Sequence, residues 1–196
     1  MVTHVKLLET MLHIITPLYR FDLLPQVYES IPKEDDIIWH ISVSTKREPI
    51  PYNFIYKNDK IKLYYVDCLD NDTSKKRNEI FSKLTDGYFC FLDDDTIFHE
   101  NMYKLYLEKQ NENFVGMVVG NQVNKHNKPR LNGKIPRLNG IDTGNVLCHT
   151  SCLEQVSWPR IEVKARDGVF WINVYEYYNK NCSIKNEVIS IYNKLR

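Results

Sequence analysis

A short apolar run that ends in three consecutive aspartates is the feature that most constrains this sequence. Residues 88–92 read Tyr-Phe-Cys-Phe-Leu, Gly87 precedes them, and Asp93, Asp94 and Asp95 follow directly. An unbroken apolar run of this length that is rich in aromatic residues predicts a strand buried on both faces. Such strands belong to mostly parallel sheets with helices on both sides. The run therefore predicts an α/β fold.

The position of the three aspartates predicts a ligand site. Open α/β sheets bind ligands beyond the carboxyl ends of their strands, and these side chains follow such an end. A single acid there would be read as a turn or a helix cap, but three adjacent carboxylates repel one another and a bound cation relieves the repulsion. If the extended geometry continues, Asp93 and Asp95 point to one side and Asp94 to the other. Oxygen ligands of this kind suit Mg²⁺ or Mn²⁺, and Mg²⁺ usually keeps substrate phosphates in its shell.

The rest of the chain alternates between strand and helix patterns. Apolar runs predict strands at residues 11–15, 37–43, 61–66, 114–119 and 145–148, and helical patterns lie at 22–31, 74–84, 99–109 and 165–180. This alternation predicts right-handed crossovers and a Rossmann-like, doubly wound, mostly parallel sheet. Asp22 is the predicted N-cap of the first helix. The last fifteen residues are expected to form a strand that covers the sheet, followed by a frayed tail.

The pattern changes after Gly120. Residues 121–139 are polar and basic, and the sequence Pro-Arg-Leu-Asn-Gly occurs twice, at 129–133 and 136–140. Asn-Gly pairs predict tight turns, here hairpins that extend from the sheet. The cations of this segment either contact an anionic ligand or lie in solvent.

Length, charge and cysteine content narrow the class of protein. A chain of 196 residues fits one domain. Twenty-six basic and 25 acidic residues give a net charge of +1, which argues against a nucleic-acid partner or general membrane-surface binding. The five cysteines are odd in number and scattered, which predicts reduced thiols and a cytoplasmic protein. No run of eighteen apolar residues occurs, so no transmembrane segment is expected.

Five short segments, taken in order, carry a resemblance to a known family. They are Thr-Pro-Leu-Tyr-Arg at 16–20, Lys-Arg-Asn at 76–78, Phe-Leu-Asp-Asp-Asp at 91–95, Gly-Ile-Asp-Thr-Gly-Asn at 140–145 and Arg-Asp-Gly at 166–168. In this order they resemble nucleotide-sugar-dependent glycosyltransferases of the GT-A fold, most closely the compact family-2-like type found in large DNA viruses. The resemblance covers about residues 11–178. It implies one GT-A domain over 1–196, with a nucleotide-sugar-binding half (11–120) and a smaller acceptor-side half (121–196).

The resemblance also implies a reaction and a donor site. The expected reaction moves a sugar from a nucleoside diphosphate sugar, with a UDP-sugar favoured, to a hydroxyl of a glycan or glycoprotein acceptor. Asp95 and Asp93 would bind a Mn²⁺ or Mg²⁺ ion that bridges the donor's diphosphate, and Asp94 or Asp93 would meet the ribose. The other residues expected against the nucleotide are Thr16, Pro17, Tyr19, Arg20 and Arg77. Residues 42–46 lack the acidic residue with which the family often reads the base.

Two of these assignments compete with simpler interpretations. Arg77 either approaches the nucleotide, where its planar fork suits anionic oxygens, or lies on a solvated helix face beside Lys75 and Lys76. Asp167 is the expected catalytic base, which would make the reaction inverting, but Asp is also among the best helix N-caps. Asp142 is the reserve base. His149 is either a metal ligand or a structural residue.

Other classes of protein remain to be separated from this one. The P-loop and Rossmann glycine motifs are absent, and a phosphohydrolase would carry its Asp-x-Asp on the first strand. A nucleotidyltransferase is the nearest enzymatic alternative, because it also holds metal and triphosphate with paired acids. A non-catalytic sugar- or nucleotide-binding module would keep the fold and lose metal-dependent nucleotide affinity.

Overall fold

Eight strands form one mixed sheet in the computed structural model, which describes residues 10–160 and 162–195. The strands are β1 (Met11–Pro17), β2 (Ile37–Ser44), β3 (Ile61–Val66), β4 (Gly87–Phe91), β5 (Met117–Asn124), β6 (Pro129–Leu131), β7 (Val146–His149) and β8 (Cys182–Tyr192). The helices are α1 (Leu24–Ser30), α2 (Asn53–Lys57), α3 (Thr73–Phe81), α4 (Glu100–Asn111) and α5 (Arg166–Tyr177), with short 3₁₀ turns η1 (Thr143–Asn145) and η2 (Thr150–Glu154).

The sheet is parallel in its first half and mixed in its second. Its order is β3-β2-β1-β4-β7-β5-β6, and β8 pairs with β5. The strands β3, β2, β1 and β4 run parallel, β7 is antiparallel to both β4 and β5, and β8 is parallel to β5. The predicted α/β fold with a mostly parallel sheet is confirmed.

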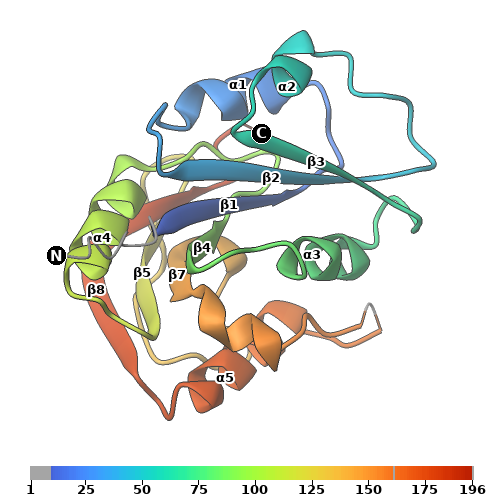
Figure 1. Cartoon of the computed structure of the whole chain (residues 1–196). Helices are drawn as coiled ribbons and strands as arrows, with labels where there is room; N and C mark the ends of the chain where they lie inside the picture. The colour runs from blue at the N-terminus through green and yellow to red at the C-terminus, as the bar shows by residue number, and fades with distance from the viewer. Residues whose placement is uncertain (1–9, 161, 196) are drawn as a thin grey trace, which may run out of the picture.

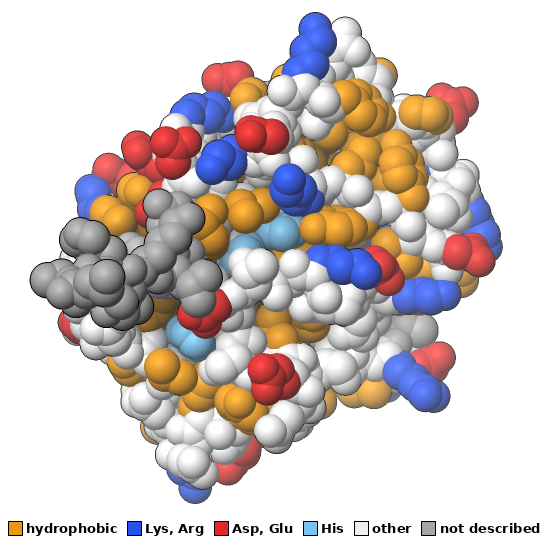
Figure 2. Space-filling model, viewed as in Figure 1, with side chains coloured by type: hydrophobic (Ala, Val, Ile, Leu, Met, Phe, Trp, Pro, Cys, Tyr) orange, Lys and Arg blue, Asp and Glu red, His pale blue; other side chains and the backbone are white. Residues whose placement is uncertain are grey.

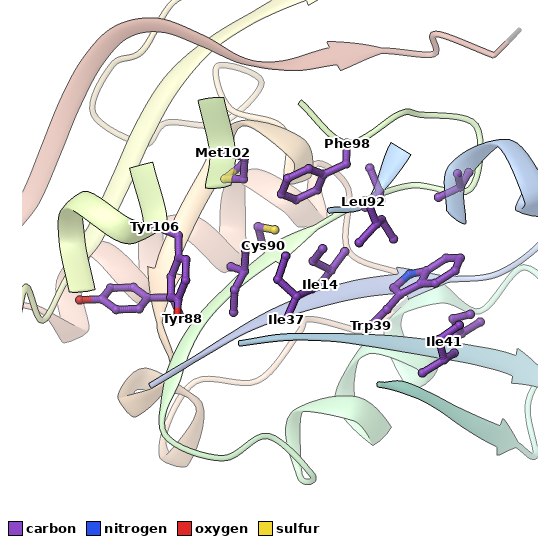
Figure 3. Close-up of a cluster of buried hydrophobic side chains, with 14 of the residues drawn as sticks. Ile14, Ile37, Trp39, Ile41, Tyr88, Cys90, Leu92, Phe98, Met102 and Tyr106 are labelled. Atoms are coloured by element: carbon purple, nitrogen blue, oxygen red, sulfur yellow. The ribbon is translucent and has the colours of Figure 1, made fainter. Parts of the chain in front are cut away.

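Two apolar cores cover the two faces of the sheet, with α1 on one side and α3 and α5 on the other (Figure 1). The strand β4 contributes to both. Tyr88 and Cys90 pack in the core under α1 and α4, whereas Phe89 and Phe91 pack against α3 and α5. Figure 3 shows the first of these cores, in which side chains of β1, β2 and β4 meet Met102 of α4. The predicted burial of β4 on both faces is therefore confirmed.

Three elements differ from the sequence predictions. Asp22 does not cap α1, because Leu23 occupies the N-cap position and no side chain caps the helix. The strand predicted at 114–119 begins at Met117 and continues to Asn124, where it also pairs with β6 and β8. The C-terminal strand predicted as a cover is instead the eleven-residue β8, a member of the sheet that runs beside β5. Long-range pairing, which local patterns do not show, decides the last two.

The predicted hairpin region is partly as expected. The Asn-Gly pair at 139–140 forms a turn, since Asn139 has a left-handed φ of 58° and the amide of Gly140 donates to Arg137 O at 3.1 Å. The hairpin between β5 and β6, however, turns at residues 124–128, with Asn127 at a φ of 58°. Asparagine tolerates this conformation better than most residues.

Charges of both signs are intermixed on the surface. The face in Figure 2 carries Lys and Arg side chains among Asp and Glu side chains, without a field of one sign. This distribution agrees with the near-zero net charge of the sequence.

A buried pair of histidines joins β1 to β2. His13 Nδ1 lies 3.0 Å from His40 Nε2, and His40 Nδ1 lies 3.0 Å from the hydroxyl of Tyr64. Burial lowers the pKa of His13 to about 4 and that of His40 to about 3. Both rings are therefore neutral in the folded protein at neutral pH, so one can donate to the other.

We expect this pair to make the fold sensitive to acid. In the unfolded chain both histidines titrate near pH 6.5, so the unfolded state binds more protons and stability falls as the pH drops below that value. Each histidine contributes a slope of about 1.4 kcal/mol per pH unit, down to its folded pKa. Urea unfolding at about pH 7 and about pH 5 measures the loss. A His13→Gln/His40→Gln variant should show a shallower pH dependence than the exposed control His126→Gln, and equal slopes would contradict the assignment.

Candidate functional site

The site lies where the order of the strands reverses. The chain places β2 on one side of β1 and β4 on the other, so the crossover connections diverge between β1 and β4. Ligands of open α/β sheets bind outside the carboxyl ends of strands at such a point. A cleft of about 380 Å³ opens there, and we call it the central cleft. Its lining residues are Pro17, Tyr19, Arg20, Asp70, Asn71, Thr73, Arg77, Asp93, Asp94, Asp95, Arg166, Asp167, Tyr192 and Asn193.

The three aspartates do not continue the extended strand. β4 ends at Phe91, and the amide of Thr96 donates to Asp93 O at 3.0 Å, which closes a turn. The alternation expected for an extended chain, with Asp93 and Asp95 on one side, is therefore wrong. Instead, Asp94 and Asp95 share one cation and Asp93 faces another.

Asp94 anchors the segment that follows β1. One of its oxygens accepts hydrogen bonds from the backbone amides of Tyr19 and Arg20, at 2.6 and 2.7 Å. The other oxygen lies 2.9 Å from Arg20 Nε and 2.7 Å from Arg20 Nη2. The residue is 2% exposed. Both oxygens are thus engaged within the chain, and Asp94 shapes the loop that carries Tyr19 and Arg20.

Asp95 also contacts Arg20. Its Oδ2 accepts from Arg20 Nη1 at 2.9 Å, and the hydroxyl of Thr96 lies 3.4 Å from its Oδ1. Burial raises the pKa of Asp95, while Arg20 opposes the rise. The guanidinium of Arg20 therefore bridges two of the three consecutive aspartates.

Of the three aspartates, Asp93 has the longest distance between its carboxylate and the nearest arginine nitrogen. Its nearest cation is Arg77, with Nη2 3.6 Å from Oδ1, and the hydroxyl of Thr143 lies 3.5 Å from Oδ2. Removal from water raises the pKa of Asp93 to about 7; Arg77 opposes the rise and nearby carboxylates add to it. A carboxylate of this kind is stabilised by a proton or by a cation at neutral pH.

Arg77 is not on a solvated helix face. It is 6% exposed, and its guanidinium lies over the ring of Trp158, 4.2 Å from the ring centre, and 5.2 Å from that of Phe91. The neighbouring Lys76 is fully buried as well, with Nζ 2.6 Å from both Leu18 O and Asp70 O. The interpretation of a solvated helix face is therefore wrong for both residues. The sequence of α3 by itself does not indicate that these two basic side chains are buried. Stacking on aromatic rings fixes the Arg77 fork toward the cleft.

Asp167 lines the cleft from α5. It lies in the first turn of α5, and the N-cap of that helix is Ala165, so Asp167 does not cap it. Burial raises the pKa of Asp167, with Arg77 opposing and Asp142 adding to the rise. The adjacent Arg166 donates from Nη1 to Ser74 Oγ at 2.8 Å and so ties α5 to α3.

The remaining predicted residues divide into two groups. Pro17 and Tyr19 line the central cleft, and Tyr19 is 48% exposed. Thr16 does not line it: this residue is fully buried, donates to Leu92 O at 2.7 Å and accepts from Trp39 Nε1 at 2.9 Å. Asp142, the reserve base, also lies outside the lining and pairs with Arg130 at 2.9 Å.

His149 lies at the far end of β4 from the aspartates. It is the last residue of β7, pairs in register with Tyr88, and its Nε2 is 3.5 Å from Asp86. It therefore does not meet the acid cluster. The structural interpretation of this histidine fits its position.

Sequence reasoning missed two groups of lining residues. The first group is Asp70 and Asn71 in the loop before α3 and Thr73 at the start of that helix; the second is Tyr192 at the end of β8 and Asn193 just after it. The backbone of the C-terminal segment also reaches the acids, since the amide of Leu195 donates to Asp95 O at 2.9 Å. The polar run before a helix was a usable signal for the first group. The second depends on the parallel pairing of β8, which has no local signal.

The donor set fits a divalent cation that is held partly by substrate. Among the described residues, no group of three or more His, Cys, Asp or Glu side chains is arranged to hold a metal ion. Mg²⁺, however, is commonly bound by one or two carboxylates together with substrate phosphates. Asp93 and Asp95 supply hard oxygen atoms of that type at the cleft. Burial raises the pKa of Asp93, and nearby carboxylates add to the rise, so a cation beside this carboxylate would be favourable.

Comparison with solved structures identifies the fold. Residues 1–349 of TarS from S. aureus superpose with a TM-score of 0.74 at 15% identity, covering 93% of this chain and 60% of that one. The same TarS chain in complex with UDP-GlcNAc gives a TM-score of 0.74 at 14% identity, over 93% and 58% of the two chains. The chain shares the GT-A-like α/β fold of these structures.

A second glycosyltransferase shows the same arrangement. The mannosyltransferase PcManGT from Pyrobaculum calidifontis, in complex with GDP-Man and Mn²⁺, superposes with a TM-score of 0.67 at 11% identity, over 92% of this chain and 56% of that one. This chain thus spans roughly 60% or less of the length of these neighbours. No protein-family model and no curated protein matches the amino-acid sequence. Among the described helices, none has both the length and the apolar character that a membrane crossing requires.

Proposed function

We propose that this protein is a metal-dependent glycosyltransferase that moves a sugar from a nucleoside diphosphate sugar, with a UDP-sugar favoured, to a hydroxyl of a glycan or glycoprotein. One observation carries the proposal. The fold gathers Tyr19, Arg77, Asp93, Asp95 and Asp167, from four separate segments, around one cleft at the switch point of the sheet. The neighbours crystallised with UDP-GlcNAc, UDP and GDP-Man support the same class of donor.

The cleft has the charges that a nucleotide diphosphate and a cation need. Arg20, Arg77 and Arg166 line it together with carboxylates. We assign the nucleoside to the Pro17–Tyr19 side. In this assignment, Arg77 donates to diphosphate oxygens with its stacked, planar fork. Asp93 and Asp95 hold Mn²⁺ or Mg²⁺, which when bound stabilises the departing diphosphate as a Lewis acid.

Asp167 is the residue that we assign to the acceptor. A sugar hydroxyl must lose its proton when it attacks, and a carboxylate on the opposite side of the sugar can take it. Asp167 enters the cleft from α5, whereas the metal-binding aspartates enter it from the end of β4. In this assignment the donor sugar lies between the base and the leaving group, and the reaction inverts the anomeric centre by one displacement.

A screen for donor hydrolysis tests the proposal without knowledge of the acceptor. Slow transfer of sugar to water is expected for one or more UDP- or GDP-sugars in the presence of Mn²⁺, and EDTA should suppress it. Release of nucleoside diphosphate is the readout, with boiled protein and Asp95→Asn as controls. Pyrophosphate released from a nucleoside triphosphate and a sugar phosphate would favour a nucleotidyltransferase instead. Metal-dependent nucleotide binding without either reaction would favour a non-catalytic module.

A further inference from the structure

Arg20 bridges the two carboxylates that follow Asp93. Its Nε and Nη2 lie 2.9 and 2.7 Å from Asp94 Oδ1, and its Nη1 lies 2.9 Å from Asp95 Oδ2. Both aspartate side chains are 3% exposed, whereas the Arg20 side chain is 27% exposed. A single cationic group with access to the cleft therefore pairs with two buried anions and offsets part of their charge.

The two halves of this bridge are unequal. Asp94 holds Arg20 through two side-chain contacts and also accepts from the Arg20 backbone amide at 2.7 Å. Asp95 holds it through one side-chain contact, from Nη1. Loss of the Asp95 contact would leave the guanidinium paired with Asp94. The Nη1–Asp95 contact is thus the one that can be given up at least cost.

A divalent ion bound to Asp95 Oδ2 would lie close to the guanidinium of Arg20. Carboxylate oxygens bind Mg²⁺ at roughly 2.0–2.1 Å, and Arg20 Nη1 already lies 2.9 Å from Oδ2 of that carboxylate. Two cations so close on one carboxylate repel each other strongly. Either the ion is excluded or Nη1 moves away.

We propose that Arg20 is a resident counter-ion that competes with the divalent cation for Asp95 and releases this carboxylate when the cation binds. The inference rests on the proposed function and adds a regulatory step to it. Without metal, Arg20 prevents repulsion between Asp94 and Asp95. With metal, Asp94 keeps the arginine in place, so the cleft gains an ion without losing the loop that carries Tyr19.

Titration of the protein with Mn²⁺ alone tests the competition. The electron paramagnetic resonance signal of the free ion measures how much Mn²⁺ stays unbound and so gives the affinity. Arg20→Lys keeps a positive charge for Asp94 but lacks the fork that reaches Asp95 at the same time. It should bind Mn²⁺ about tenfold more tightly than the wild type, because a charge-assisted hydrogen bond no longer opposes the ion. The matched control is Arg47→Gln. Arg47 holds the same loop, with Nη2 2.7 Å from Tyr19 O, and its nearest carboxylate is Asp70 at 3.5 Å.

A stability measurement supplies a second readout. Arg20→Gln should lower the melting temperature in EDTA, since the buried carboxylates lose the positive charge of Arg20. Added Mn²⁺ should then raise the melting temperature of Arg20→Gln more than that of the wild type, because the ion replaces the missing charge. If Arg20→Gln does not fold, Arg20→Lys supplies the comparison, because its tighter Mn²⁺ binding should also raise the melting temperature more than in the wild type.

The outcomes separate this inference from the proposed function. Equal Mn²⁺ affinity in wild type and Arg20→Lys would overturn the competition and leave metal-dependent transfer standing. Equal tightening in Arg47→Gln would also overturn it, since the effect would then come from loosening the loop that both arginines hold. If neither the wild type nor Arg20→Lys binds Mn²⁺, the metal part of the proposed function fails, and the competition fails with it.

Discussion

Replacement of Asp95 by asparagine is expected to abolish metal-dependent nucleotide binding. Asparagine keeps the shape of the side chain but removes the charge that a divalent ion requires. Loss of an outer-shell partner alone typically lowers metal affinity roughly 10- to 100-fold, so loss of a direct carboxylate ligand should exceed about a hundredfold. Calorimetric titration with UDP and with GDP, in Mn²⁺ and in EDTA, measures the effect.

An aspartate at the other end of β4 offers a matched control for this variant. Asp86 lies just before the amino end of β4 with a side chain that is 66% exposed, and its partner is His149 at 3.5 Å. Asp86→Asn removes an equal charge far from the central cleft and should leave nucleotide affinity unchanged. Wild-type affinity that is the same with metal and with chelator would count against any role of Asp95 in holding a metal.

Replacement of Asp167 by asparagine is expected to stop sugar transfer while donor binding persists. Removal of a general base typically slows a reaction by about 10²- to 10⁴-fold. Asparagine cannot take the acceptor's proton, yet it leaves Asp93 and Arg77 in place to bind the donor. Transfer rate and donor affinity must therefore be measured on the same preparation. Glu176→Gln, an exposed acid near the end of the same helix, is the control. Transfer retained in Asp167→Asn would remove this residue as the base.

The pH dependence of the wild type supplies an independent check on Asp167. A general base works only when it is deprotonated, so kcat/KM must fall on the acid side of its pKa. Because burial raises the pKa of Asp167, that fall should lie at a higher pH than an exposed aspartate would give. Rates measured at saturating Mn²⁺ keep the nearby Asp93 from contributing. An acid limb at or below the range of a free aspartate would contradict the assignment.

The amino-acid sequence alone determined the fold class and pointed to the edge of the sheet where the candidate site lies. The run at 88–92 is apolar or aromatic at every position, which is typical of a strand buried on both faces, and β4 is such a strand. Three acids directly after it pointed to the carboxyl edge of the sheet, and the central cleft opens there. These features are local, because periodicity and residue type set them within a few positions. For the same reason the approximate bounds of β1, β2 and β3 were predictable.

Only the tertiary structure decided which charged groups face one another. The pairing of Arg20 with Asp94 and Asp95 joins residues 74 and 75 positions apart. The burial of Arg77 depends on Trp158, which arrives from the loop before α5. In a basic helix pattern both lysine and arginine look solvated, and only a partner from a distant part of the chain can make their burial favourable. The sequence gives the position of each charged residue along the chain. Which charged residue lies beside it in space depends on the order of the strands in the sheet.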